Sequence, residues 1–406
     1  MLGDLSRRRF IEGTAGATLS ALGARSLWSE ATHRAPPAVP GWLPIGDLQS
    51  NIPRLLELAL VPGLAVGVID NGMTWMRGFG RTRAGEGHPI DENTVFEAAS
   101  LGKPLCAYAA LRLVDAGKLQ LDRPLYQYVR LVDGDNDRMR RVTLRHVLSH
   151  STGLPNWRKE VGPLEPAADP GTSFSYSGEA FFYLQRVMES VTGTPFAHLM
   201  GDLVLSPLGM TNSSFVWRPE YVERMATGHD ADGRPMEVMS AIGRRIQIIA
   251  EEWHRPLLDW RYQEAAKAVT LVNPAWPELP LYMVPNAATS LLTTVDDYLR
   301  FLSRVVGHDA PARLALSGEM SQAMMTPQIE LNRELSWGLG WGLERDGDQT
   351  LLWQWGANNA FRNFFIADPA NGRAVVVFTN GENGPRVYER VITAITRSDH
   401  AAFLWV

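Results

Sequence analysis

The chain has 406 residues, 45% of them hydrophobic and 20% charged, with a formal net charge of −5 at pH 7. This composition supplies ample material for a hydrophobic core and excludes intrinsic disorder as the main state. No basic stripe stands out, so the electrostatic basis for nucleic-acid binding is missing. Cys106 is the single cysteine, which excludes intramolecular disulfides and cysteine-rich metal sites. Low cysteine content by itself favours the reducing cytosol.

The N-terminus points instead to export. Residues 6–11 read Ser-Arg-Arg-Arg-Phe-Ile and are similar to a twin-arginine signal, and residues 13–23 form a weakly apolar stretch too short to span a bilayer. Ser29-Glu30-Ala31 offers a cleavage point, so we expect a signal over residues 1–31, recognised by the export machinery, and a periplasmic or secreted mature protein. The alternative is an amphipathic tail with chance arginines. No later stretch reaches 18 apolar residues, so we expect no membrane span in the mature chain.

The rest of the chain divides into a Pro-rich linker over residues 32–45 and one folded unit over residues 46–400. Two short apolar runs flank Asn71-Gly72, a pair typical of a tight hairpin turn. The C-terminal end repeats this pattern around Asn371-Gly372. The predicted strands are residues 64–69, 73–79, 351–355, 362–367 and 374–379, and apolar residues at helical spacing predict a helix over 385–396.

Between these ends the pattern is mostly helical. Helices are predicted over residues 101–116, 144–150, 178–192 and 295–306, with glycines at 117, 153 and 193 marking their ends. Residues 230–285 give no clear pattern. Because strands come from both chain ends, the expected fold class is α/β (α+β), with one antiparallel sheet built from both ends, flanking helices and an inserted, mainly helical region.

The sequence contains no Gly-x-Ser-x-Gly, so the nucleophile turn of α/β-hydrolases is absent. It does contain one Ser-x-x-Lys, Ser100 to Lys103. On a helix this spacing puts both side chains on one face, where a lysine shielded from water can activate a serine hydroxyl. If Ser100 begins the helix, its free backbone N–H can also stabilise an oxyanion. The alternative is a helix cap followed by a solvated lysine.

Three further segments follow in order: Leu144–Pro155, which contains Ser-His-Ser-Thr-Gly-Leu-Pro; Tyr176-Ser177-Gly178; and Gln354-Trp355-Gly356. Together with Ser100 and Lys103 they resemble the motifs of the serine β-lactamase and penicillin-binding protein superfamily, nearest its class C β-lactamase and esterase branch. The resemblance covers about residues 50–395 and implies a β-lactamase/transpeptidase-like fold.

The resemblance also implies roles for individual residues. Ser100 would be the acylated nucleophile, and Lys103 would keep the network of Ser100 and Tyr176 correctly charged. Tyr176 would be the general base through its phenolate, although holding a tyrosine ionised at pH 7 costs about 4 kcal/mol. Whether Tyr176 or Lys103 takes the proton stays open. The backbone N–H groups of Ser100 and Ala357 would form the oxyanion hole.

Two departures from the family pattern concern the substrate-binding positions Gly178, Gln354, Trp355 and Gly356. Gly178 stands where an asparagine is expected, and Gln354-Trp355 stands where a lysine or histidine is expected. In β-lactamases the asparagine amide helps to hold the acylamino group, and the lysine helps to bind the substrate carboxylate. Both changes favour a less charged ester or amide substrate over a β-lactam.

Other residues suit structural roles better than chemical ones. His146 and His150 have the spacing of a helical metal pair, but no third ligand is evident, so no metal and no cofactor are expected. Cys106 has apolar neighbours and is read as a core residue. The aromatic segment Trp337–Gly342 would either line a cleft or pack within strands and turns.

The sequence therefore predicts an exported serine hydrolase that forms an acyl-enzyme at Ser100 and cleaves ester or amide bonds of a small-molecule or peptide-like substrate. A β-lactamase is the second interpretation. A non-catalytic binder of ligands like those of penicillin-binding proteins is the third, because Gly178 and Gln354 depart from the pattern.

Overall fold

The computed structural model describes residues 41–43, 46–131, 135–158, 163–272, 284–307, 316–358 and 360–405. The predicted signal over residues 1–31 and nearly all of the linker over residues 32–45 lie outside the described residues. Within the described part of the chain, no helix is both long and apolar enough to cross a membrane.

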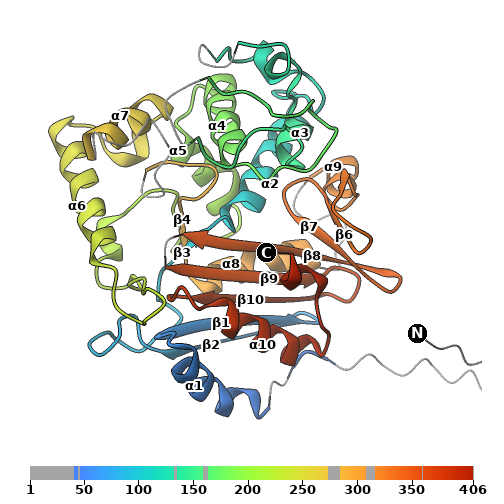
Figure 1. Ribbon diagram of the computed structural model, residues 1–406. Helices are drawn as coiled ribbons and strands as arrows, with labels where there is room; N and C mark the ends of the chain where they lie inside the picture. Colours follow the sequence, from blue (N-terminus) through green and yellow to red (C-terminus); the bar gives the residue numbers. More distant parts are fainter. Residues whose placement is uncertain are drawn as a thin grey trace, which may run out of the picture. The chain divides into compact units, whose positions relative to one another are not determined.

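The central element is an eight-stranded antiparallel sheet with the strand order β2-β1-β10-β9-β8-β7-β6-β5. As predicted, both ends of the chain build it, because β1 near the N-terminal end pairs with β10 near the C-terminal end (Figure 1). The strands are β1 (Gly63–Asp70), β2 (Met73–Gly80), β5 (Ile329–Glu330), β6 (Leu335–Trp337), β7 (Gly342–Asp346), β8 (Gln349–Asn358), β9 (Phe361–Asp368) and β10 (Arg373–Thr379).

Local sequence explains the two hairpins. Asn71 and Gly72 have φ angles of 51° and 81°, the left-handed values that a two-residue turn between twisted strands requires. Gly372 has a φ of 63° in the turn between β9 and β10. Every residue of β1 and β10 is buried, which is why both read as continuous apolar runs rather than alternating ones.

Helices cover both faces of the sheet (Figure 1). On one face lie α1 (Leu48–Ala59) and α10 (Pro385–Thr396), which contact each other and the strands beneath them. On the other face α8 (Val295–Val306) packs against β1, β9 and β10. Gly67 of β1 permits this packing, because a Cβ there would lie 2.6 Å from Leu299 Cδ1 of α8.

The inserted region is mainly helical and extends beyond one edge of the sheet (Figure 1). Its helices are α2 (Gly102–Asp115), α3 (Leu144–Leu148), α4 (Gly178–Thr192), α5 (Phe196–Met200), α6 (Glu237–Glu252), α7 (Tyr262–Val272) and α9 (Gly318–Met324). Short turns of helix are η1 (Leu125–Gln127), η3 (Met139–Arg141), η4 (Gly201–Leu205), η5 (Pro219–Tyr221), η6 (Leu257–Asp259) and η7 (Ala401–Leu404). A small second sheet joins β3 (Phe96–Ala99) to β4 (Leu291–Thr293).

Most predicted elements are confirmed, and three helices, α4, α8 and α10, have the predicted bounds. One helix end is wrong: α3 stops at Leu148, so Gly153, with its φ of 76°, shapes the following loop rather than ending a helix. The segment over residues 230–285 contains α6 and α7, which the sequence pattern did not resolve. The short strands β5, β6 and β7 were also not predicted.

Candidate active site

The site is built around the turn from β3 into α2. Ala99 has a φ of 53°, a conformation that costs a non-glycine residue about 1–3 kcal/mol and that recurs at functional sites. Ser100 follows it directly and is 7% exposed. Gly356 of β8 lies against this turn, where a Cβ would be 2.2 Å from Ala98 O. The absence of a side chain at Gly356 therefore lets β8 approach the serine.

Lys103 lies one turn along α2 with its side chain directed at the serine. Its Nζ donates to Ser100 Oγ at 2.9 Å and to Ala288 O at 2.9 Å. The side chain is almost fully buried, which overturns the alternative of a solvated lysine. No carboxylate forms an ion pair with it among the described residues, and burial lowers its pKa to about 7. A large share of Lys103 is therefore unprotonated at neutral pH.

Tyr176 brings the third polar group to the site. Its hydroxyl hydrogen-bonds the side chain of Ser100 and accepts from Gln354 Nε2 at 3.2 Å. Burial raises the pKa of the phenol, and Lys103 Nζ faces the ring at 4.9 Å from its centroid. Gln354 is neutral and also donates to Ser100 O at 3.3 Å. The hydroxyl is therefore held in its protonated form between Ser100 and an uncharged amide.

His150 positions the segment that carries Tyr176. Its ring stacks on the tyrosine ring with 4.1 Å between centroids. His150 Nδ1 accepts from Ser177 N at 3.0 Å, and the backbone oxygen of His150 accepts from Ser175 N at 2.6 Å. Burial, and secondarily the charge of Lys103, hold the pKa of His150 well below its usual range. The imidazole is thus a neutral support with contacts on both sides of Tyr176.

Part of β8 forms a free edge at the site. β7 pairs with β8 only as far as Trp353, whereas β9 pairs with it through Asn358. Within the described parts of the chain, residues 354–358 therefore have no strand partner on the side opposite β9. Ala357, predicted to supply an oxyanion-hole N–H, is exposed on this edge.

Gly178 departs from the family pattern for a steric reason. It is the first residue of α4, after the N-cap Ser177, whose side chain accepts from Ala180 N. A Cβ at position 178 would lie 2.4 Å from the indole of Trp157. The space that an asparagine side chain would need is therefore filled by Trp157, a residue that sequence reasoning did not single out.

Aromatic side chains build one wall of the site. Trp355 lies beside Tyr176 with 4.5 Å between ring centroids, and Trp405, near the C-terminal end, packs against Trp355 at 5.7 Å. Trp337 and Trp341 are fully buried, so the packing interpretation of that segment is correct and the cleft interpretation is wrong.

Cys106 and His146, the remaining candidates from the sequence, have contacts typical of residues that support the fold. Cys106 is buried as predicted, and burial raises the pKa of its thiol. His146 caps its own helix, because its Nδ1 accepts from Thr143 N at 3.2 Å. In the part of the chain that the structure describes, no three His, Cys, Asp or Glu side chains are grouped as metal ligands.

The fold and the Ser100–Lys103–Tyr176 arrangement define a protein of the β-lactamase/transpeptidase-like class. A solved class C β-lactamase superimposes with a TM-score of 0.66 at 20% identity, covering 87% of this chain and 95% of that chain. The octameric penicillin-binding protein homologue of Pyrococcus abyssi gives 0.67 at 20% identity, covering 87% and 78%. Residues 48–397 match the Beta-lactamase family, and the chain belongs to that family.

Relatives of known name carry several activities. Esterase EstB of Burkholderia gladioli is 28% identical over 380 residues, covering 82% of this chain and 90% of that protein. A Beta-lactamase of Pseudomonas fluorescens is 29% identical over 204 residues, covering 47% and 56%. The D-alanyl-D-alanine-carboxypeptidase/endopeptidase AmpH of Escherichia coli is 25% identical over 207 residues, covering 45% and 52%. The chain is accordingly a serine hydrolase.

Proposed function

We propose that the protein is an esterase or amidase that forms an acyl-enzyme at Ser100 and acts on small or peptide-like substrates. The observation that carries the proposal is the 2.9 Å contact between Lys103 Nζ and Ser100 Oγ, with the Tyr176 hydroxyl bonded to the same serine. A nucleophile within hydrogen-bond reach of a base is the arrangement that covalent catalysis requires.

Lys103 acts as the general base in this proposal. Unprotonated Nζ takes the proton from Ser100 Oγ as Oγ attacks the carbonyl carbon of the substrate. Burial lowers the pKa of Lys103 to about 7 and raises that of Tyr176. No cation lies at position 354 to stabilise a phenolate, because Gln354 is neutral. Lys103 thus takes the role of general base that the family resemblance assigned to the phenolate of Tyr176.

The remaining steps follow from the same contacts. The negative charge on the carbonyl oxygen is stabilised by the backbone N–H groups of Ser100 and Ala357. When the tetrahedral intermediate collapses, the leaving oxygen or nitrogen takes a proton from the Tyr176 hydroxyl, and the proton held by Lys103, whose Nζ lies 4.9 Å from the centroid of the Tyr176 ring, replaces it. Water then attacks the acyl carbon and loses a proton to Lys103, and Lys103 returns this proton to Ser100 Oγ as the carboxylic acid leaves.

The substrate-facing positions favour esters over β-lactams. Gln354 supplies no positive charge for a substrate carboxylate, and Trp157 fills the space that a side chain at Gly178 would use. Gln354, Trp355 and Gly356 would contact the substrate along the free edge of β8. The match to an esterase over most of both chains supports this choice.

Mass spectrometry of the folded protein after incubation with a fluorophosphonate and, separately, with a penicillin tests the proposal. We expect the fluorophosphonate to label Ser100 and the penicillin to leave the protein unmodified, with Ser100→Ala as the unlabelled control. A stable or turning-over penicilloyl adduct would support the β-lactamase. Labelling by neither reagent would support the non-catalytic binder and contradict the hydrolase site.

We also propose that residues 1–31 direct export by the twin-arginine route. The support is the Arg7-Arg8 pair followed by Phe10 and a short apolar stretch. Replacing Arg7, Arg8 and Arg9 together with lysine keeps the charge. We expect the protein to remain in the cytoplasmic fraction of a bacterial host after this change. Unchanged export would contradict the proposal.

A further inference from the structure

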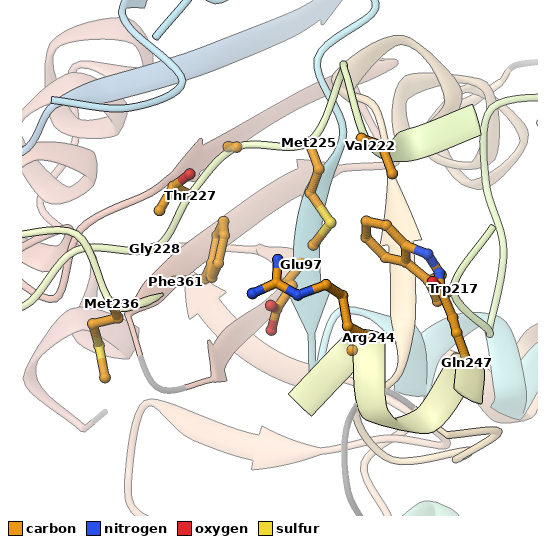
Figure 2. Close-up of a pocket in the computed structure, with 12 residues that line it drawn as sticks. Glu97, Trp217, Val222, Met225, Thr227, Gly228, Met236, Arg244, Gln247 and Phe361 are labelled. Atoms are coloured by element: carbon orange, nitrogen blue, oxygen red, sulfur yellow. The ribbon is translucent and has the colours of Figure 1, made fainter. Parts of the chain in front are cut away.

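A cavity of about 290 Å³ lies between β3, the start of β9, α6 and the segment over residues 217–228 (Figure 2). Its wall is mostly apolar and includes Trp217, Val222, Met225, Met236 and Phe361. Ligand pockets begin at about 300 Å³ and are lined mainly by apolar side chains with a few placed polar groups. The cavity is therefore suited to a short, largely apolar chain.

A hydrogen bond connects the end of β8 to a residue that lines the cavity. Asn358 directly follows Ala357, and its Nδ2 donates to Glu97 Oε2 at 3.2 Å. Glu97 belongs to β3, three residues before Ser100, and lines the cavity. A substrate whose carbonyl oxygen lies at Ala357 and whose acyl chain follows β8 is thus directed toward Glu97. None of Ser100, Lys103 and Tyr176 lines this cavity, which makes it a separate subsite.

Two charged side chains line the cavity, Glu97 in a buried position and Arg244 in an exposed one. Glu97 is 4% exposed, and burial raises the pKa of its carboxyl group to about 8, so the group is mainly neutral at pH 7. The Arg244 side chain extends from α6 toward Glu97 (Figure 2). Arg244 forms no ion pair with a carboxylate among the described residues. Among the described residues the cavity therefore combines an exposed guanidinium that has no carboxylate partner with a buried carboxyl group that can donate a hydrogen bond.

We propose that this cavity binds the acyl part of the substrate, and that the acyl chain ends in a carboxylate held between Arg244 and Glu97. Arginine binds a carboxylate through strong charge-assisted hydrogen bonds, and the protonated Glu97 donates to the second side of the same anion. The inference rests on the proposed hydrolase function and adds the substrate class: esters or amides of short dicarboxylic acids. The substrate carboxylate would thus be recognised on the acyl side of the scissile bond, at Arg244. Position 354 would take no part in this recognition, because Gln354 carries no charge.

The test compares two esters of nearly the same shape. 4-Nitrophenyl adipate carries a free carboxylate, and its methyl ester is neutral. We expect kcat/KM to be about tenfold or more higher for the carboxylate. Arg244→Gln should remove most of this ratio by lowering kcat/KM for the anionic ester, and Arg244→Lys should retain part of it. The matched control is Arg245→Gln, the next residue of α6, which pairs with Glu252 and does not line the cavity. It should keep the wild-type ratio.

Two outcomes would overturn the inference while leaving the hydrolase intact: equal turnover of both esters, or a preference for the cationic 4-nitrophenyl 6-aminohexanoate. A binding measurement distinguishes failure of the proposed acyl subsite from failure of the proposed hydrolase function. Adipate should bind the Ser100→Ala protein in a calorimetric titration and should bind the Ser100→Ala/Arg244→Gln protein at least tenfold more weakly. Equal binding by both proteins would contradict the subsite even if no ester were hydrolysed.

Discussion

Two neighbouring regions of this molecule, the Ser100 centre and the cavity lined by Glu97, each bury a titratable side chain and satisfy it differently. At the Ser100 centre, Lys103 donates hydrogen bonds to Ser100 Oγ and Ala288 O. The Tyr176 hydroxyl is hydrogen-bonded to the side chains of Ser100 and Gln354. In the cavity beside it, Glu97 bonds Asn358, but Arg244 has no ion-pair partner among the described residues. We infer that the polar groups of the first region need no ligand, whereas the second region presents a guanidinium that an anionic ligand can bind. In the proposed account, the groups of the first region perform the chemistry and those of the second recognise the substrate.

The largest effect is expected from Lys103→Ala. The substitution removes the proposed base, which contacts Ser100, so kcat/KM for 4-nitrophenyl esters should fall by about 10²–10⁴-fold. Lys118→Ala, at an exposed residue just after α2, is the control and should have little effect. The measurement is steady-state ester hydrolysis, with circular dichroism to establish folding. Turnover near the wild-type value in Lys103→Ala would show that the centre has been assigned to the wrong residues.

The pH profile distinguishes the two candidate bases. Lys103 must be unprotonated to accept the serine proton, so kcat/KM for 4-nitrophenyl acetate should rise with pH through about 7 and then level off. Tyr176→Phe should lower the rate and keep this rise, because burial keeps the tyrosine protonated in the wild-type protein. Loss of the rise in Tyr176→Phe would assign the base to the tyrosine instead.

A smaller effect is expected at His150, a positioning residue. His150→Phe removes the acceptor for Ser177 N and leaves a buried N–H unpaired, at a cost of about 1–3 kcal/mol. We expect a lower melting temperature and a lower kcat with KM little changed. His150→Asn can restore the acceptor, and asparagine tolerates the φ of 53° at this position. This variant should therefore recover part of the melting temperature and part of kcat. A purely structural role would lower stability without changing kcat.

The sequence predicted the two terminal hairpins and the longer strands of the sheet because these elements depend on local chemistry. The turns at Asn71-Gly72 and Asn371-Gly372 require left-handed backbone, and the apolar runs beside them are buried on both faces. The strands β5 to β7 are two to five residues long, too short for a periodic pattern to be recognised. The helices α6 and α7 lie in a segment whose polar and apolar residues gave no clear stop signals.

The site was predictable in part for the same reason. Ser100, Lys103 and Tyr176 belong to short motifs, and the structure brings them together. Trp157 and His150 contact residues more than 20 positions away, and the proposed role of Arg244 depends on a cavity. No local pattern encodes such contacts. The glycine at position 178 was the available signal for Trp157, because a missing side chain in a motif indicates that another group occupies its space.

The most direct test of the account is to trap the covalent intermediate with an ester substrate itself. Wild-type protein turning over 4-nitrophenyl adipate is quenched in acid, digested and mapped by mass spectrometry, with Ser100→Ala in parallel. The account predicts an adipyl adduct on the peptide that contains Ser100 and neither adduct nor turnover in Ser100→Ala. An adduct on another residue, or ester turnover that persists in Ser100→Ala, would contradict it.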